Sequence, residues 1–372
     1  MRRRARICAA VVAALALCAP AAGTPAAAAP GPVPVMAYYY IWFNASSWNR
    51  AKLDYPLLGR YSSDERSVMA RQIRWAQQAG IQGFIVSWKS TPTLDRRLKT
   101  LVDVATRAHF KLALIYQGLD FHRRPLPAAK VRADLELFAR RYARAAPFQI
   151  YDKPLVIWSG TWRFTPAEEA RVTSGLRRSL LVLASEKNPR DYARVAGSFD
   201  GDAYYWSSAD AMRTPTHERK LRRMAAVVHR HRGLWVAPAA PGFDARLIGG
   251  TKIVPRRGGA TLRRSLDHAL ASSPDILGII SWNEFTENSY VEPSRRYGFQ
   301  SLRVLADVLG ARVPVSGDLD SSQSSPTGAR YGLPVIGAFL ALVLGGAALL
   351  SPRRRAARRR RTAARTQDRW AP

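Results

Sequence analysis

The chain has 372 residues, of which 47% are hydrophobic and ten are tryptophan, so it can bury a large core. This length suits one α/β barrel or two ordinary domains. The net charge of +31 raises the possibility of nucleic-acid binding. No zinc-finger, helix-turn-helix or aromatic RNA-binding pattern accompanies that charge, and we expect no nucleic-acid partner. A basic protein is also suited to anionic wall polymers or lipid headgroups.

The first 29 residues have the three parts of a secretory signal peptide. Arginines at positions 2–4 and 6 precede an apolar run over 7–17, and small residues at 26–29 suit cleavage. The sequence therefore predicts a signal peptide over 1–29 and an exported protein. Both cysteines, Cys8 and Cys18, lie within this segment, so the mature fold does not depend on disulfides.

The other end of the chain predicts a membrane anchor. Residues 331–351 contain no charge and are numerous enough to span a bilayer. The arginine-rich tail over 352–372 follows directly, which places the C-terminus in the cytoplasm by the positive-inside bias. Residues 315–330 are rich in Ser, Gly, Asp and Pro and predict a flexible linker. We expect a protein anchored in the plasma membrane with its bulk outside.

Between residues 33 and 314, short apolar runs alternate with helical patterns, which favours βαβ units and a parallel sheet. Eight such runs suggest a single closed (β/α)₈ barrel of the TIM type, with its active site at the C-terminal ends of the strands. A doubly wound open sheet is the alternative, but no Gly-rich phosphate loop follows the first run. The eight runs are 35–43, 81–88, 112–116, 154–158, 180–184, 202–206, 234–238 and 276–281.

Helix signals separate these runs. Residues 63–65 open a helical pattern that Gly80 ends. Thr165 and Glu168 have the spacing of a capping box, with Pro166 at the first helical position. A last helix is predicted over 300–309.

Two glutamates, Glu284 and Glu287, follow the eighth predicted strand. Residues three apart in a helical turn have Cβ atoms about 5–6 Å apart. Carboxyl groups this close do not both ionise readily, so one tends to keep its proton near neutral pH. Retaining glycoside hydrolysis uses an acid and a base roughly 5–5.5 Å apart. The alternative is a solvated surface loop, but the preceding buried strand and the adjacent Trp282 and Asn283 favour a site.

Aromatic residues recur at the C-terminal ends of the predicted strands. An aromatic face is apolar and rigid, and the C–H-rich face of a sugar ring packs well against it. Each one singly could instead fill the core; their recurrence at one end predicts a sugar-binding rim. The candidates for substrate binding are Tyr39, Tyr40, Trp42, Trp88, Tyr116, Trp158, Tyr205, Trp206 and Trp282.

The segment 281–287, Ser-Trp-Asn-Glu-Phe-Thr-Glu, resembles the N-E-W-x-E-G signature of glycoside hydrolase family 99, the endo-α-mannosidases and endo-α-mannanases. Residues 241–246, Pro-Gly-Phe-Asp-Ala-Arg, resemble the family's P-G-[YF]-D-x-R segment. The resemblance covers most of 33–309 and is specific over the last 55 residues of that range. Phe285 replaces the usual Trp and Asn288 the usual Gly, so we expect the turn after the second glutamate to differ.

The resemblance implies roles for named residues. Glu284 would take the proton of the substrate's 2-hydroxyl, which attacks the anomeric carbon to give a 1,2-anhydro sugar. Glu287 would protonate the departing oxygen and later deprotonate water, with net retention. Asp244 and Asn283 would bind the substrate. No cofactor is implied, and no His/Asp/Glu cluster has the spacing of a metal site.

Three functions remain open from the sequence. The first is a membrane-anchored, extracytoplasmic, retaining glycoside hydrolase, expected to be a monomer, that cleaves α-linked mannan or another wall glycan. The second is a carbohydrate-binding or wall-organising protein that uses the aromatic rim without turnover. The third is a sugar transferase, although no nucleotide-sugar site is evident.

Overall fold

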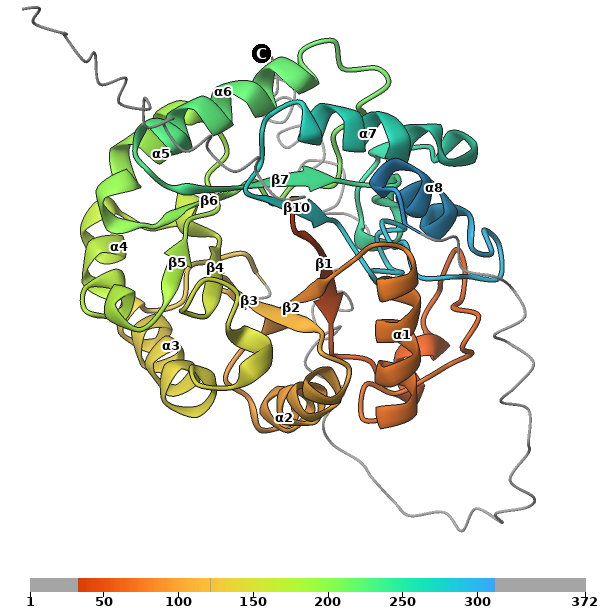
Figure 1. Cartoon of the computed structure of the whole chain (residues 1–372), viewed down its shortest axis with the longest axis horizontal. Coiled ribbons are helices and arrows are strands. Elements are labelled where there is room, and N and C mark those ends of the chain that lie inside the picture. Colours follow the sequence, from red (N-terminus) through yellow and green to blue (C-terminus); the bar gives the residue numbers. More distant parts are fainter. Residues whose placement is uncertain (1–32, 121, 312–372) are drawn as a thin grey trace, which may run out of the picture. The chain divides into compact units, whose positions relative to one another are not determined.

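The computed structural model describes residues 33–120 and 122–311. The predicted signal peptide, the linker, the apolar segment 331–351 and the basic tail lie outside the described residues. Among the helices that are described, none combines the length and apolar character that a bilayer span requires. The described chain forms one ring of parallel strands surrounded by helices (Figure 1).

The sheet closes into a barrel, as predicted. Its strand order is β5-β4-β3-β2-β1-β10-β7-β6, and every neighbouring pair is parallel. The last gap closes where the Ala184 amide donates to the carbonyl of Gly201 and the Ala203 amide donates to the carbonyl of Ala184, each at 2.9 Å. The open-sheet alternative is therefore excluded. The barrel strands are β1 (Val35–Tyr40), β2 (Gly83–Trp88), β3 (Lys111–Gln117), β4 (Leu155–Ser159), β5 (Leu181–Leu183), β6 (Gly201–Ala203), β7 (Leu234–Ala239) and β10 (Ile276–Ile279).

All eight strands lie where the apolar runs predicted them, but five are shorter than predicted, and the first and sixth end before the last aromatic residues of their runs. The first ends at Tyr40, its last residue paired with β2, and the sixth ends at Ala203, its last residue paired with β7. The aromatic residues that follow are therefore in loops at the mouth of the barrel. A separate antiparallel hairpin of β8 (Phe243–Asp244) and β9 (Ile253–Val254) lies in the connection after β7.

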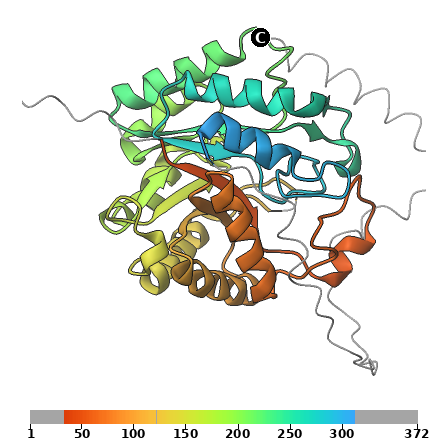
Figure 2. The ribbon, with the colours of Figure 1, turned by 45° about the vertical axis from the view of Figure 1, so that its right-hand side comes forward.

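Helices cover the outside of the barrel (Figures 1 and 2). The Gly80 stop is confirmed by its φ of 83°, and the capping box is confirmed by mutual hydrogen bonds between Thr165 and Glu168. The helices are α1 (Arg66–Gln78), α2 (Pro92–Arg107), α3 (Ala128–Tyr142), α4 (Pro166–Thr173), α5 (Pro189–Val195), α6 (His217–Arg230), α7 (Ala260–Leu270) and α8 (Gln300–Leu309).

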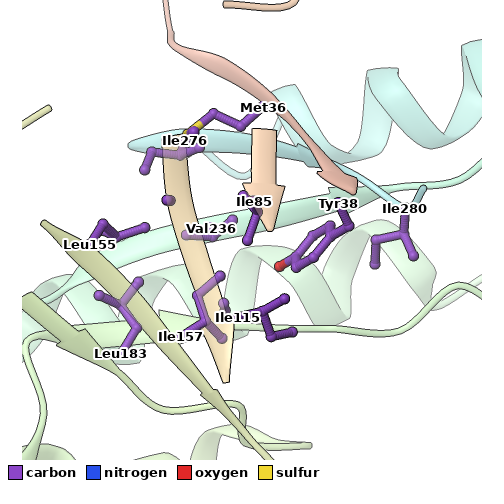
Figure 3. Packing of buried hydrophobic residues seen from close by; sticks show 12 residues of the cluster. Met36, Tyr38, Ile85, Ile115, Leu155, Ile157, Leu183, Val236, Ile276 and Ile280 are labelled. Atoms are coloured by element: carbon purple, nitrogen blue, oxygen red, sulfur yellow. The ribbon is translucent and has the colours of Figure 1, made fainter. Parts of the chain in front are cut away.

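The barrel interior is filled by alternate residues of the strands (Figure 3). Successive side chains of a strand point to opposite faces, so Met36 and Tyr38 point inward with Ile85 and Ile115, and Tyr39 points outward. Gly278 makes room for the Tyr38 ring, because a Cβ at this position would lie 3.1 Å from it. A filled interior excludes a through-channel and leaves the C-terminal rim as the place for a site.

Candidate active site

The two glutamates lie in a turn that leaves the C-terminal end of β10 and is held on both sides. The Trp282 amide donates to the carbonyl of Tyr38 at 2.7 Å, which ties the start of the turn to β1. The Glu292 amide donates back to the carbonyl of Trp282 at 2.8 Å, which closes the segment. Phe285 is fully buried and stacks on Tyr290 at 4.0 Å between ring centroids. The backbone that presents the carboxyl groups is therefore fixed.

Glu284 and Glu287 are close enough in this turn for the charge of Glu287 to act on Glu284, and neither is fully sealed from solvent. Glu284 is 7% exposed, and one of its carboxyl oxygens accepts a hydrogen bond from the Thr286 amide at 3.0 Å. Glu287 is partly exposed, and its carbonyl accepts from the Asp244 amide at 2.7 Å. The turn is not a regular helix, because the Ser289 amide donates to the carbonyl of Glu284 at 3.3 Å, five residues back.

The pair is arranged to hold a proton at neutral pH. Burial, and next the charge of Glu287, raises the pKa of Glu284 to about 8. Burial also raises the pKa of Glu287, while the charge of Arg123 opposes that rise. A carboxyl group near another in a poorly solvated site is a usual feature of acid–base catalysis. Two carboxyl groups that interact this closely share the proton between them, and the family resemblance assigns the acid role to Glu287.

Two tyrosines stand beside the pair. The Tyr40 and Tyr205 hydroxyls are in hydrogen-bond contact, and the Tyr205 ring lies 4.6 Å from that of Tyr38, so the aromatic column of the barrel interior continues to the mouth. Burial raises the pKa of both tyrosines, and the charges of Glu284 and Glu287 raise it further. Both hydroxyls therefore stay protonated; one donates to the other, and the second is available as a hydrogen-bond donor.

Four of the predicted aromatic residues lie at this mouth. Tyr40 and Tyr205 are the hydroxyl pair described above. Trp42 is 42% exposed and stacks on Tyr40 with ring centroids 4.3 Å apart. Trp206 is partly exposed and follows Tyr205 directly. These residues can contact a bound glycan.

The other five predicted aromatic contacts are corrected by the structure, which gives them at most 1% exposure. The physical reason is strand alternation: a side chain one position away from an inward one points to the helices. The Tyr39 hydroxyl donates to Gln72 of α1 at 2.5 Å, and the Tyr116 hydroxyl donates to Asp134 of α3 at 2.8 Å. The remaining three pack on buried rings: Trp88 on Phe138, Trp158 on Phe164, and Trp282 on Phe84.

Asn283 and Asp244 lie at the site but are buried in supporting positions. Asn283 accepts from the Tyr40 amide at 2.9 Å and donates to the Tyr40 carbonyl at 3.0 Å, which fixes the end of β1. Asp244 is 3% exposed and accepts two hydrogen bonds from the Arg246 guanidinium, at 3.0 and 2.7 Å. The backbone amide of Asp244 donates to the carbonyl of Glu287, so Asp244 supports the second glutamate.

The two departures from the family signature fit their positions. Asn288 has a φ of 51°, a left-handed conformation that Asn tolerates better than most residues other than Gly. The Arg256 guanidinium donates to the carbonyls of Asn288 and Tyr290 at 3.0 and 2.7 Å, which fixes the backbone of the turn. The smaller Phe285 fits edge-on against Trp48 at 5.5 Å.

Sequence reasoning did not single out two cations near the carboxyl pair. Arg123 follows β3 and acts on Glu287, and Lys52 follows the short helix over Ala45–Asn49 and acts on Glu284. Both lie far from the glutamates in the sequence, and no local motif marks them. Sequence reasoning also did not single out Glu292, although this acid lies in the same segment as the two glutamates and could have been considered with them. Its carboxyl group accepts hydrogen bonds from Tyr61 at 2.9 Å and from Gln72 at 2.7 Å.

A hollow of about 530 Å³ lies at the other end of the barrel, near the start of β7. Its lining includes Arg177 and Asp200, which form an ion pair at 2.8 Å, and Leu234. Asp200 is the only carboxyl group in the lining, so this hollow has no acid–base pair. Within 33–120 and 122–311, no three His, Cys, Asp or Glu residues gather as a metal site would require.

Comparisons with known proteins identify the family of this chain. The family model for glycosyl hydrolase family 99 matches residues 47–305, more than half of the chain. The chain belongs to glycosyl hydrolase family 99. That family consists of glycoside hydrolases, and the matched relatives have endo-α-mannosidase names.

The relatives of this family 99 chain are distant. A Danio rerio protein named "glycoprotein endo-alpha-1,2-mannosidase-like protein" is 23% identical over 271 residues, 64% of this chain and 58% of that protein. The chain thus matches less than two thirds of the length of this curated relative. Among solved structures, the GH99 endo-alpha-mannosidase from Bacteroides thetaiotaomicron has a TM-score of 0.64 at 18% identity, over 74% of this chain and 97% of that one. A glycoside hydrolase-like protein has a TM-score of 0.57 at 17% identity, over 79% and 98%. These structures support the barrel fold.

Proposed function

We propose that this chain is a retaining endo-glycosidase that cleaves α-linked mannan or a similar wall glycan with Glu284 and Glu287. The observation that carries the proposal is the carboxyl pair at the barrel mouth, in which Glu284 is buried and has its pKa raised to about 8. Such a pair holds one proton at neutral pH, so it can supply an acid and a base in the same turnover. The names of its relatives point to α-linked mannose as the sugar.

The proposed reaction uses the pair as follows. Glu284 accepts the proton of the substrate's 2-hydroxyl, whose oxygen bonds to the anomeric carbon as the glycosidic C–O bond breaks. Glu287 gives its proton to the departing oxygen. Water then opens the 1,2-anhydro ring, losing a proton to Glu287 while Glu284 returns its proton to the 2-oxygen. Two inversions at the anomeric carbon give net retention.

The proposed roles require the proton of the pair to be on Glu287 when the glycan is bound. A 2-hydroxyl that donates to Glu284 stabilises the ionised form of this carboxyl group and lowers its pKa. The proton of the pair is then held by Glu287, where the departing oxygen lies. The hydroxyls of Tyr40 and Tyr205 stand beside both carboxyl groups, and the one that does not donate to its partner donates to the sugar.

The test is hydrolysis of α-mannan by the purified full chain, followed by the appearance of reducing ends. We expect Glu284→Gln and Glu287→Gln each to lower kcat by about 10³-fold, the scale of a lost general acid or base. Glu136→Gln, which removes an exposed carboxyl group of α3, is the control and should retain full activity. Full activity in both site variants would refute the assignment. Saturable glycan binding without cleavage would favour a carbohydrate-binding protein, and lengthened glycans a transferase.

We also propose that the barrel is outside the cell, tethered through 315–330 to a membrane segment over 331–351, with the tail in the cytoplasm. The support is the charge-free length of that segment and the arginines after it. The mature chain has no cysteine, so single cysteines report topology. We expect a membrane-impermeant maleimide to label Ser316→Cys on intact cells and to label Thr362→Cys only after lysis. Labelling of both on intact cells would contradict the anchor.

A further inference from the structure

A group of cations lies at the C-terminal end of the barrel, on the side of β3 to β6. Arg123 is in the loop after β3, Arg163 ends a short helix after β4, Lys187 follows β5, and Lys220 is in the first turns of α6. We call these four residues the cationic rim. Loops after parallel strands gather at one end of a barrel, which is why residues almost a hundred positions apart meet here.

Aromatic rings hold the two lysines of the rim in place. The Lys187 ammonium lies 4.7 Å from the ring centre of Trp162 and 5.3 Å from that of Trp206, and the two rings are 5.9 Å apart. The Lys220 ammonium lies 4.5 Å from the ring centre of Tyr204 and donates to its hydroxyl at 2.7 Å. Cation–π contacts of this kind fix the direction of an ammonium group that is otherwise flexible.

The rim has positive charge that the described protein does not neutralise. None of its four members forms an ion pair with a described carboxylate, whereas Arg97 and Arg257 do, with Asp64 and Asp210. Both lysines are only partly exposed, so water screens them incompletely.

The rim cations repel one another. Burial lowers the pKa of Lys187, the charges of Arg123 and Arg163 lower it further, and Glu186 and Asp191 oppose the change. Burial lowers the pKa of Lys220, and the charge of Lys187 adds to that effect. Holding like charges together in a poorly screened place costs free energy, and an anion bound among them would offset that cost.

The rim adjoins the place of cleavage. Trp206, which contacts Lys187, directly follows Tyr205, whose hydroxyl contacts Tyr40 beside the carboxyl pair. Arg123 acts electrostatically on both Glu287 and Lys187, so it is near both the carboxyl pair and the rest of the rim. A glycan that extends from the carboxyl pair towards this side would reach the rim.

We propose that the cationic rim binds an anionic substituent of the glycan, a phosphate ester or a sugar carboxylate, so that the natural substrate is an acidic rather than a neutral polysaccharide. This inference rests on the proposed cleavage of a glycan at Glu284 and Glu287. Lysine ammonium groups bind phosphate and carboxylate oxygens by charge and hydrogen bonds, without requiring a particular sugar. A neutral glycan would leave the rim's repulsion in place.

The test compares three α-mannan oligosaccharides of equal length: one neutral, one with a phosphate ester and one with a uronic acid residue. For the full chain we expect kcat/KM to be at least about 10-fold higher for an anionic form, and this ratio to shrink at high salt. The preferred anionic form identifies the source of the charge. Equal kcat/KM for all three would overturn the inference.

The variant is Lys187→Gln/Lys220→Gln, and the matched control is Lys99→Gln/Arg74→Gln, which removes two exposed cations of α2 and α1. We expect the anionic-to-neutral ratio to fall about 10-fold in the rim variant and to stay unchanged in the control. A purely structural role would lower kcat/KM for every oligosaccharide and leave the ratio as in the native protein, which would also overturn the inference.

Binding to the inactive Glu287→Gln variant, measured by calorimetry, separates this inference from the proposed function. If no oligosaccharide is cleaved by the native chain but the anionic form binds in a Lys187-dependent way, the hydrolase proposal fails and the rim remains a site for acidic glycans. If the neutral form is cleaved and no charge preference exists, the rim proposal fails and the hydrolase proposal stands.

Discussion

Tyr39 and Tyr40 are neighbours on β1, yet they belong to two different regions of the molecule. Tyr39 points outward and donates to Gln72 of α1, while Tyr40 points into the mouth and contacts Tyr205. The outer region also contains Trp88, Tyr116 and Trp158, which are fully buried against helices. The difference shows that the face of the strand decides the role of an aromatic residue at a strand end: an outward side chain packs against helices, and an inward one lies at the mouth. Substitutions on the two sides should therefore have opposite consequences.

The largest effect is expected from the outer region. Trp158→Ala removes a fully buried ring that packs on Phe164 at 4.7 Å and faces Gly118. We expect the free energy of unfolding to fall by about 3–5 kcal/mol, the range for large-to-small changes in a core. Urea unfolding followed by tryptophan fluorescence measures it.

The control is Trp42→Ala at the mouth, where the ring is 42% exposed. We expect its unfolding free energy to change by less than about 1 kcal/mol, with the loss appearing in KM for glycan. Equal destabilisation by the two substitutions would show that the two regions are not distinct in this way.

Glu292 and Glu284 allow the supporting region and the mouth to be compared through the pH dependence of stability and of kcat. Burial raises the pKa of Glu292 to about 8, and its partners Gln72 and Tyr61 lie behind the mouth. The unfolded chain releases this proton near pH 4.5, so stability is greatest below that pH and falls as the pH rises towards 8. We expect this residue to account for about 3 kcal/mol of that fall between pH 5 and pH 7.5, measured by urea unfolding.

Glu292→Gln should flatten this pH dependence of stability. The decline of kcat as the pH rises through about 8 should remain, because it reports the proton shared by Glu284 and Glu287, which the departing oxygen needs. If the substitution removes both pH dependences, the two carboxyl groups act as one network.

The smallest effects come from single hydroxyl groups. Tyr40→Phe removes the contact with Tyr205 and a donor at the mouth, and we expect kcat/KM to fall about 10-fold, or about 1.4 kcal/mol, with little change in stability. Tyr39→Phe removes the hydrogen bond to Gln72, and we expect about 1 kcal/mol of stability to be lost with kcat/KM unchanged. Kinetics and thermal unfolding of both variants check the pair, and a reversed pattern would contradict the assignment of faces.

Much of the fold could be predicted because its signals are local. The apolar runs marked all eight strands, and Gly80 and the Thr165–Glu168 capping box marked helix ends. The prediction placed four buried aromatic residues at the mouth because they stand at strand ends, without considering that successive side chains of a strand point to opposite faces. These residues are Tyr39, Trp88, Tyr116 and Trp158. Counting in twos from Tyr40, the last residue of β1 and on its mouth-facing side, would have turned Tyr39 outward.

The sequence by itself determined the repeated strand–helix order, the two glutamates after the last barrel strand and the segments that predict export and anchoring, since each depends on residues close together in the chain. Only the tertiary structure decided which aromatic residues face a glycan. It also decided that Arg123 comes near both Glu287 and Lys187, because closure of the barrel sets the distances between its loops. Burial, together with the charge of Glu287, raises the pKa of Glu284 to about 8. The spacing of residues in the sequence does not show how far the folded site excludes water, so this shift could not be predicted.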